Sequence, residues 1–447
     1  MNEQLLLFPT PEHIEEANSV NFYKGKPRLK SPIRTQVEFV NSCLDDLIPE
    51  DHQVRSIWNY VDQMDLSLFL NKINSTSSNP GRPAINPKIL LALWIYAIIE
   101  GIGSARVIDR YCSEHIAFKW LCGGVSVNYH TISDFRKNNS NEFDELLSQI
   151  IARLMQRDLI TLKRVSQDGM RVRASAGSSS FRRKTKLKEL LIIATEQVNS
   201  LKKELDEDAA SCLNRQTAAK KRASEERLKR LQEALEEHRK SIIDLTNAKK
   251  KHYKQLTQEK KDKIRASTTD PKARKMKMSN GGFNPAYNLQ IAVDTESRFI
   301  IGGYVTNKGS DYGELLAMFS KIKNKYSKIA REWLVDQGYL DHQDIIKVQK
   351  SGCKVYVNPK EQTKKNPNEP RCTEDCELAE WRVRMGMDEA KEIYKDRAAT
   401  SEWVNAGMRN RGLQQMLVRG LRNVSSVLNL HALTHNISRA VKLGFSW

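Results

Sequence analysis

The chain has 447 residues, in which 73 Lys and Arg outnumber 54 Asp and Glu, for a formal net charge of +19. This length predicts two or three domains, and the basic excess favours a polyanionic partner, most often nucleic acid, over a merely basic soluble protein. Seven scattered cysteines argue against a disulfide framework and suit a reducing cytoplasm. The start of the chain lacks the pattern of a signal peptide, and the most apolar segment, 89–99, is too short to span a membrane.

The first third of the chain predicts an arm followed by helices. Residues 1–32 are mixed and contain proline, which indicates an extended N-terminal arm. Residues 33–160 carry apolar positions at three- and four-residue steps, the period of an all-helical domain. Within it, the run 89–99 predicts a buried helix that ends at a turn containing Gly101 and Gly103.

The segment GVSVNYHTISDFRK, residues 124–137, predicts a short helix capped by Ser or Asn. It also fits the reading element of a helix-turn-helix, because short polar and basic side chains at the start of such a helix reach base edges. The candidate DNA-binding residues are His130, Thr131 and Arg136. A capped connecting helix without DNA contacts is the alternative.

The remainder, residues 161–447, predicts an α/β domain with a mixed sheet, interrupted by a long insertion. Residues 182–264 are dense in Leu, Glu, Lys and Ala with almost no Gly or Pro, which indicates an antiparallel helical hairpin. A helix is expected to begin at Asp311 and another to cover 342–350. Strands are expected at 163–175, 286–294, 298–307, 331–340 and 353–359.

Three carboxylates are placed to meet in this domain. Asp168 and Asp336 are expected at strand ends, where enzyme sites in such sheets gather, and Glu402 lies on a following helix. Three acids at one point repel each other unless divalent cations lie between them, and Mg2+ prefers such oxygen ligands. Two metal ions could activate an attacking water and stabilise a leaving oxygen at one phosphorus. The alternative is ordinary, since Asp-Gly is a common turn pair and a lone Glu often forms an ion pair.

Cations surround Glu402 on its predicted helix. Arg409 follows Glu402 by seven residues and shares its face, while Tyr394 and Arg397 lie on the flanks of that face. Arginines in this position can bind phosphate through two hydrogen bonds. The basic runs 182–188 and 249–254, at the two ends of the hairpin, are further candidates for phosphate contact.

The stretch YKDRAATSEWVNAGMR, residues 394–409, resembles the signature helix of bacterial insertion-sequence transposases of the DDE type: Tyr, two residues, Arg, a few residues, Glu, six residues, Lys. Tyr394, Arg397 and Glu402 match it, and Arg409 stands where Lys is usual. VSQDGMRVRASA resembles the segment of the first Asp, with Met170 in place of the usual Thr. WLVDQGYLD resembles the second-Asp strand, and segments between residues 33 and 160 resemble the helical domain that precedes the catalytic domain in one branch of the family.

The resemblance implies an RNase H-like catalytic core with a long helical insertion, preceded by an all-α N-terminal domain. It implies that Asp168, Asp336 and Glu402 are catalytic and bind two Mg2+ ions, for which Mn2+ substitutes. Tyr394, Arg397 and Arg409 would position DNA. The expected activity is cleavage at the terminal inverted repeats of an insertion sequence and joining of the 3′ ends to target DNA. A homodimer on DNA, at the nucleoid in the bacterial cytoplasm, is the expected state.

Two alternatives remain open from the residues. A non-catalytic DNA-binding protein derived from such an enzyme, a repressor or an inactivated copy, would keep the fold and the basic surface. A nuclease of the same fold that cuts without joining would keep every residue named above. The presence of all three acids favours an enzyme over the non-catalytic protein, and only a joined DNA product would separate the transposase from the nuclease.

Overall fold

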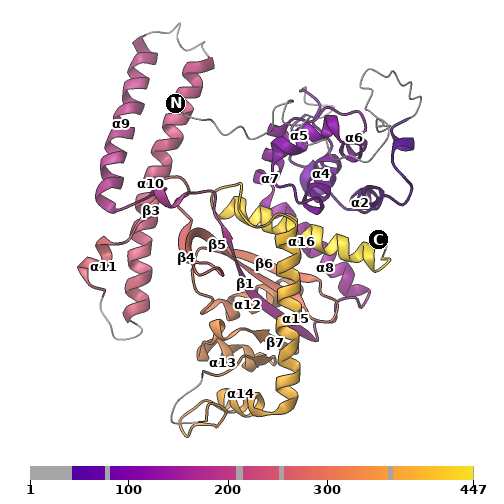
Figure 1. Cartoon of the computed structure of the whole chain (residues 1–447), viewed down its shortest axis with the longest axis vertical. Coiled ribbons are helices and arrows are strands. Elements are labelled where there is room, and N and C mark those ends of the chain that lie inside the picture. Colours follow the sequence, from indigo (N-terminus) through magenta and orange to yellow (C-terminus); the bar gives the residue numbers. More distant parts are fainter. Residues whose placement is uncertain (1–42, 76–80, 208–214, 251–255, 361–365, 446–447) are drawn as a thin grey trace, which may run out of the picture. The chain divides into compact units, whose positions relative to one another are not determined.

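The computed structural model describes residues 43–75, 81–207, 215–250, 256–360 and 366–445. The predicted arm, residues 1–32, lies outside these ranges, so the expectation for it stays a prediction. The described helices and strands come in the order expected from the sequence: helices first, then a mixed sheet with a helical insertion (Figure 1).

The described residues between 43 and 156 form helices and their connections. The central helix, α4 (Pro87–Ile99), is buried along nearly its whole length, as the apolar run predicted. Asn86 caps it by accepting a hydrogen bond from the Lys88 N–H, and Pro87 takes the first helical position, where a missing N–H costs nothing. The other helices are η2 (Asp45–Leu47), α2 (Gln53–Asp62), α3 (Ser67–Leu70), α5 (Ala105–Glu114), α6 (Ile116–Cys122), α7 (Tyr129–Asn138) and α8 (Ser140–Gln156).

A six-stranded mixed sheet forms the second part. Its main path runs β4-β5-β1-β7-β8, and β6 pairs with the other half of β5. The β1–β7 and β7–β8 pairs are parallel, and all pairs that involve β5 are antiparallel. The strands are β1 (Arg164–Arg173), β4 (Arg274–Lys277), β5 (Phe283–Asp294), β6 (Ile300–Thr306), β7 (Glu332–Val335) and β8 (Lys354–Tyr356).

Most predicted strands are confirmed, with two differences. The strand expected at 331–340 ends at Val335, because Asp336 begins a 3-10 turn, η5 (Gln337–Tyr339). The strand β4 was not predicted, since its four residues include three Lys or Arg and lack an apolar alternation. A small separate pair, β2 (Phe181–Arg182) with β3 (Ala266–Ser267), joins the two ends of the insertion.

Helices flank the sheet. α13 (His342–Lys350) covers the predicted residues, whereas α12 begins at Glu314 rather than at Asp311, whose backbone carbonyl accepts the Glu314 N–H. α15 packs on β1 and β7, and α16 packs both on β6 and on the N-terminal helices α4, α7 and α8. The tail helix therefore ties the helical region to the sheet. The bounds are α12 (Glu314–Tyr326), α14 (Cys376–Gly386), α15 (Asp388–Asn410) and α16 (Leu421–Lys442).

The insertion is the expected helical hairpin. Its described helices are α9 (Lys184–Glu207), α10 (Arg215–Lys250) and α11 (Gln258–Asp262), and α9 packs against α10. Their contact is a small apolar cluster separate from the main core, which fits an outer surface exposed to solvent. The buried members of this cluster are Leu187, Ala194, Leu231, Ala234 and Ala266.

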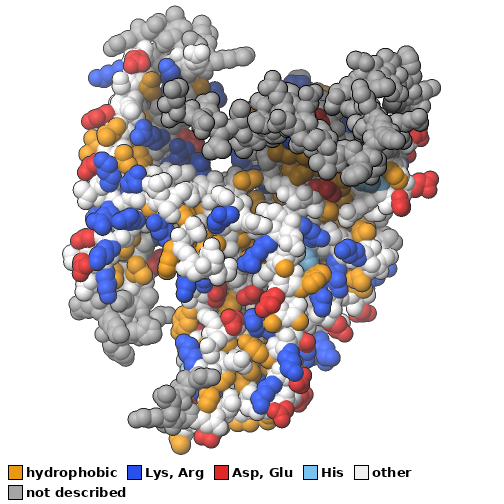
Figure 2. Space-filling model, in the orientation of Figure 1, with side chains coloured by type: hydrophobic (Ala, Val, Ile, Leu, Met, Phe, Trp, Pro, Cys, Tyr) orange, Lys and Arg blue, Asp and Glu red, His pale blue; other side chains and the backbone are white. Residues whose placement is uncertain are grey.

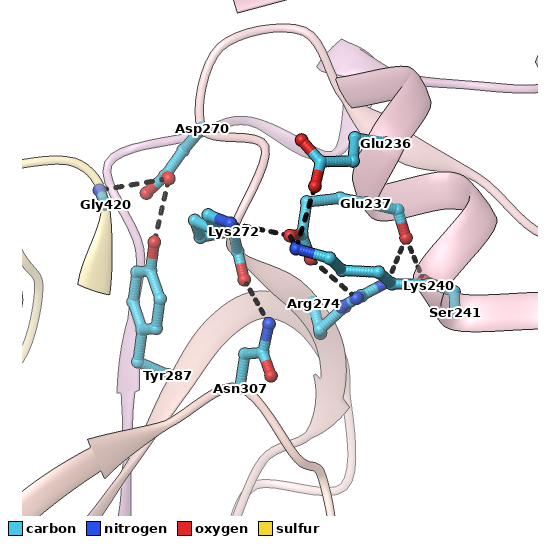
Figure 3. Close-up of polar contacts among 10 residues, drawn as sticks. All are labelled: Glu236, Glu237, Lys240, Ser241, Asp270, Lys272, Arg274, Tyr287, Asn307 and Gly420. Atoms are coloured by element: carbon cyan, nitrogen blue, oxygen red, sulfur yellow. Dashed lines mark hydrogen bonds and ion pairs between the residues drawn. The ribbon is translucent and has the colours of Figure 1, made fainter. Parts of the chain in front are cut away.

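An ionic cluster anchors the hairpin to the segment around β4 (Figure 3). Glu237 of α10 is only 3% exposed, and its carboxylate accepts hydrogen bonds from Lys272 Nζ at 2.6 Å and Arg274 Nη2 at 2.9 Å. Next to it, the Asp270 carboxylate accepts from the Tyr287 hydroxyl at 2.8 Å and from the Gly420 N–H at 3.2 Å. The acid and the two bases hold an otherwise polar hairpin in a defined place.

Candidate active site

The sequence predicted Asp168 at the end of a strand, but it lies in the middle of β1. The strand continues to Arg173 because β5 pairs with it along its whole length. On the other side, however, the parallel partner β7 ends at Val335, which pairs with Gln167. One residue further in the same register, Asp168 and Asp336 lie next to each other where β7 stops. The structure thus brings two of the three predicted acids together.

The environment of Asp168 disfavours its charge. The pKa of Asp168 is raised to about 6, mainly by burial and to a smaller extent by the carboxylates of Asp311 and Asp336, while the Gly169 N–H and Arg397 oppose the shift. The Oδ1 atom accepts the Gly169 N–H at 2.8 Å, and Oδ2 accepts Asn405 Nδ2 at 2.9 Å. A mostly buried carboxylate among acids is the environment in which a bound cation stabilises the charged form.

Asp311 was missed as a site residue by the sequence analysis, which used it only as a helix start. Its Oδ1 accepts hydrogen bonds from Asn288 Nδ2 and Gln290 Nε2, both at 2.7 Å. A Cβ atom added to Gly169 would lie 2.3 Å from that same oxygen, so Gly169 is needed for this close approach and not for a turn. Because side chains alternate along a strand, Asp311 approaches β1 from the face opposite to Asp168.

Helix α15 approaches Asp168 through Ser401 and Asn405, which are one turn apart. The buried Ser401 hydroxyl lies 2.6 Å from that of Ser166, and Asn405 donates to Asp168. Glu402 is exposed and precedes Asn405 by one turn. The predicted third acid therefore lies on the helix that reaches the site, but its side chain is turned toward solvent. Sequence spacing alone did not single out Asn405.

The three predicted DNA-positioning residues of this helix have different surroundings. Tyr394 is partly buried, and its hydroxyl donates to the Val335 carbonyl at 3.0 Å, next to Asp336. The Arg397 guanidinium lies 5.7 Å from the Tyr394 ring, and its Nε is buried without a hydrogen-bond partner among the described residues. Arg409 is exposed on the last turn of α15. Arg397 thus faces the site, and Arg409 faces solvent.

The departure at Met170 has a structural counterpart. Met170 is almost fully buried next to the site strand. It fills core space at the position where the resembling sequences carry a hydroxyl. A hydrogen bond from that position is therefore replaced here by packing.

Within the described ranges, no group of three or more His, Cys, Asp or Glu residues is close enough to hold a metal ion. The pair Asp168 and Asp336 fits a divalent cation in its chemistry, because both offer carboxylate oxygens and because burial, with a smaller effect of the nearby acids, raises the pKa of Asp168. Glu402 does not complete the set in this conformation. The expected three-acid centre stays a prediction.

The candidate reading helix α7 has the expected cap. Asn128 Oδ1 accepts from the Thr131 N–H at 3.0 Å and lies 3.2 Å from the Thr131 hydroxyl. His130 is exposed and Thr131 is partly exposed, and both lie at the start of the helix. Arg136 instead is buried, only 6% exposed, and lies over the Trp94 ring. This placement gives no support to a direct contact between Arg136 and base edges.

Further side chains of α15 and α16 also have defined surroundings. His431 and His435, four residues apart on α16, are buried in the core, and His435 Nε2 hydrogen-bonds to the Arg298 carbonyl at 2.9 Å. Trp403 is about half exposed and lies between the guanidinium groups of Arg298 and Arg439. Lys and Arg side chains are spread over the visible face of the molecule and include several on the hairpin helices, and acidic side chains gather near its middle (Figure 2). The run 249–254 lies outside the residues whose side chains are described.

Comparison with known families separates two parts of the chain. Residues 42–138 match the family described as Transposase domain (DUF772). Residues 349–441 match the family described as Transposase DDE domain. Both matches are to transposase families, and together they support an insertion-sequence DDE transposase. The chain matches no curated protein and no solved structure.

The two matches cover the described helices up to α7 and the segment from the end of α13 to α16. The second contains Tyr394, Arg397, Glu402 and Arg409, whereas Asp168 and Asp336 lie between the matched segments. The assignment of these two acids therefore rests on the geometry above. Of the helices that the structure describes, none is both long and apolar enough to cross a membrane.

Proposed function

We propose that this transposase cleaves DNA at the ends of its insertion sequence and joins the freed 3′ ends to target DNA. The observation that carries the proposal is the meeting of Asp168 and Asp336 on adjacent parallel strands, beside the helix that bears Glu402. The strand order supports an RNase H-like core, because β1 is central, with antiparallel β5 and β6 on one side and parallel β7 and β8 on the other.

Asp168, Asp336 and Glu402 would hold two Mg2+ ions, or Mn2+ in their place. Bound there, the metal would activate the attacking oxygen and stabilise the leaving oxygen of the phosphodiester. Asn405 holds the Asp168 carboxylate in one orientation, and Ser401 fixes the turn of α15 that precedes it. Completion of the site requires Glu402 to turn from solvent toward the two aspartates.

The cations around the acids would hold the DNA strand. Arg397 offers a buried Nε without a partner among the described residues, directly beside Asp168, and Tyr394 is fixed next to Asp336. A phosphate at this point would receive charge-assisted hydrogen bonds from Arg397. Arg409, with its exposed side chain, would contact the strand further along. Two element ends processed together would require a homodimer on the DNA.

One observation favours the non-catalytic alternative. Glu402 is exposed, and the described acids do not form a three-membered metal group. A protein that binds the element ends without cutting them would tolerate this arrangement. The alternative and the proposal therefore differ in whether Asp168 matters for chemistry.

The test is a cleavage and strand-transfer assay on DNA that carries the inverted repeats flanking the gene, with Mg2+ or Mn2+. Wild-type protein is expected to give both nicked ends and a joined product, and Asp168→Ala is expected to bind the same DNA without cutting it. Equal cleavage by both proteins would remove Asp168 from the chemistry. Cleavage without a joined product would assign a nuclease, and binding without cleavage by the wild type would assign the non-catalytic protein.

A further inference from the structure

A cavity of about 360 Å³ lies where the helical region meets the tail of the catalytic region. Its walls come from α4, the turn after it, α7, the end of β1, the loop that follows α15, and α16. The apolar part of the lining includes Trp94, Leu413 and Leu430. The polar part includes Arg136, Arg173 and His431. No acidic residue lines the cavity within the described part of the chain.

Arg136 is the unusual member of this lining. Its side chain is 94% buried, lies 4.2 Å from the Trp94 ring centroid, and donates from Nη1 to the Gly103 carbonyl at 2.8 Å. Its Nε has no hydrogen-bond partner among the described residues, and no salt bridge to a described acid is formed. A buried guanidinium without a counter-charge is costly, so a ligand that supplies the charge would be bound strongly.

A second buried group points to the same cavity. His431 is 5% exposed, and its Nδ1 also has no partner among the described residues. Burial and the nearby charges of Arg411 and Arg136 lower the pKa of His431 to about 3, so the ring is neutral and can donate one hydrogen bond. Arg173, at the end of β1, is exposed and adds a second positive charge to the lining.

A purely architectural role explains only part of this arrangement. The contacts of Arg136 with Gly103 and Trp94 brace the turn after α4, and an uncharged donor could make the same hydrogen bond. The unpartnered Nε, the unpartnered His431 Nδ1 and the absence of acids from the described lining are not explained by bracing. All three are explained by an anion with several acceptor oxygens.

We propose that this cavity binds a phosphate group of the DNA backbone, through Arg136, His431 and Arg173. The inference rests on the proposed function, because that function brings DNA to this chain. Arginine is suited to phosphate through its fork of donors, and the neutral histidine adds one more donor. The cavity would fix the DNA against the junction of the two matched transposase regions, since Arg136 belongs to one and His431 to the other.

The cavity and the acids are a short distance apart along β1, although the side chains of Arg173 and Asp168 point to opposite faces of this strand. Arg173 and Asp168 belong to the same strand and are separated by five residues, about 17 Å of extended chain. At 3.4 Å per base pair this corresponds to about five base pairs. The bound phosphate would therefore lie within one helical turn of the phosphodiester that is cut.

The first experiment measures the affinity of the full-length protein for inverted-repeat DNA at several salt concentrations. Arg173→Met is chosen because the side chain is exposed and the fold does not depend on it. The slope of log affinity against log salt is expected to become shallower by about one. Lys354→Met, an equally exposed cation on β8, is the matched control and is expected to keep the wild-type slope.

The second experiment follows thermal unfolding without DNA, in inorganic phosphate and in chloride of equal ionic strength. Phosphate is expected to raise the melting temperature of the wild type more than chloride does, and this extra rise is expected to be lost in Arg136→Met. If Arg136→Met does not fold, Arg173→Met is used in its place and is expected to weaken the effect.

The outcomes separate the inference from the proposed function. DNA binding with an unchanged slope in Arg173→Met would overturn the inference and leave the proposed function intact. Phosphate stabilisation with an unchanged slope would assign the cavity to a free anion and would equally overturn the assignment to DNA. Absence of DNA binding by the wild type would remove the proposed function itself.

Discussion

Two acidic residues, Glu237 in the hairpin anchor and Asp168 in the candidate site, have little solvent around them but opposite electrostatic surroundings. Glu237 receives hydrogen bonds from Lys272 and Arg274, so its charge is compensated within the chain (Figure 3). Asp168 instead is mostly buried with the acids Asp311 and Asp336 nearby, and burial is the main cause that raises the pKa of its carboxyl to about 6. The ion pairs of Glu237 stabilise the folded chain, whereas the surroundings of Asp168 disfavour the charged form of its carboxyl.

This difference indicates where a ligand acts. A compensated buried charge needs nothing further, and its removal costs stability because its partners are left unpaired. An uncompensated one lowers stability until a counter-ion arrives, so its removal costs function and leaves the fold intact or improves it. The same reasoning applies to Arg136, which has the opposite sign. Substitutions at the two acids can test this distinction directly.

The largest expected effect is on activity at Asp168. Asp168→Asn keeps the shape but removes the charge and one of the two acceptor oxygens, and DNA cleavage is expected to fall at least about a thousandfold, or about 4 kcal/mol in activation free energy. Cleavage rates under single-turnover conditions measure it. Glu237→Gln, assayed at a temperature where it is folded, is the matched control and is expected to cleave within about threefold of wild type. A large loss there as well would erase the distinction.

The second prediction concerns stability against pH in the absence of divalent metal. Because the pKa of Asp168 is raised from 3.8 to about 6 on folding, the folded chain holds this proton more tightly than the unfolded chain. Its destabilising contribution is therefore absent below pH 3.8, grows as the pH rises, and is complete above pH 6. The shift corresponds to at most about 3 kcal/mol.

Denaturant unfolding of wild type and Asp168→Asn at pH 4.5 to 8 is the corresponding measurement. The variant is expected to be the more stable protein at pH 8, with the difference shrinking toward pH 4.5. Added Mg2+ is expected to stabilise the wild type at pH 8 and to leave the variant unchanged. A wild type that is more stable than Asp168→Asn at pH 8 without metal would show that the carboxylate is compensated after all.

The third prediction concerns Glu237, the buried acid whose charge is compensated. Glu237→Gln leaves Lys272 and Arg274 without their carboxylate, and the free energy of unfolding is expected to fall by about 2 kcal/mol, less than for a fully buried pair because both cations are partly exposed. Glu236→Gln is the matched control, since the neighbouring Glu236 is exposed and pairs only with Lys240. It is expected to change stability by less than about 0.5 kcal/mol. Chemical denaturation compares the two.

The sequence carried much of the fold because the elements have strong local signals. The run 89–99 is apolar on every face and could only be a buried helix, and α13 has a capping Asp341 and an amphipathic period, so its bounds were predicted correctly. The strand β4 lacked such a signal. Its residues are mostly charged, and only pairing with β5 makes them a strand.

The sequence singled out Asp168 and Asp336 as candidate site acids, but not how they would be arranged in space. Which acids meet depends on strand register, and the register that aligns Asp168 with Asp336 is a property of the β1–β7 pair. Asp311 and Asn405 reach the site from a loop and from one face of a helix, where single residues carry no spacing pattern. A polar GSD segment between a strand and a helix is the one local signal that could have marked Asp311.

The smallest effect is expected where α15 contacts the sheet, at Ser401. Ser401→Ala removes the hydrogen bond between two buried hydroxyls, but Ser166 keeps the Arg397 carbonyl as an acceptor at 3.3 Å. The loss of stability is therefore expected to be below about 1 kcal/mol. Cleavage is expected to fall more, by about tenfold, because Ser401 sets the position of the helical turn that carries Glu402.

Ala406→Ser, on the exposed side of the same helix, is the matched control and is expected to change neither quantity measurably. Equal small losses of stability and cleavage in Ser401→Ala would mean that the contact only holds the helix. A loss of cleavage that exceeds the loss of stability would instead place Ser401 with the uncompensated site. It would extend the comparison from charges to a neutral hydrogen bond, because a contact of little structural consequence would then be retained for the orientation that it gives to Glu402.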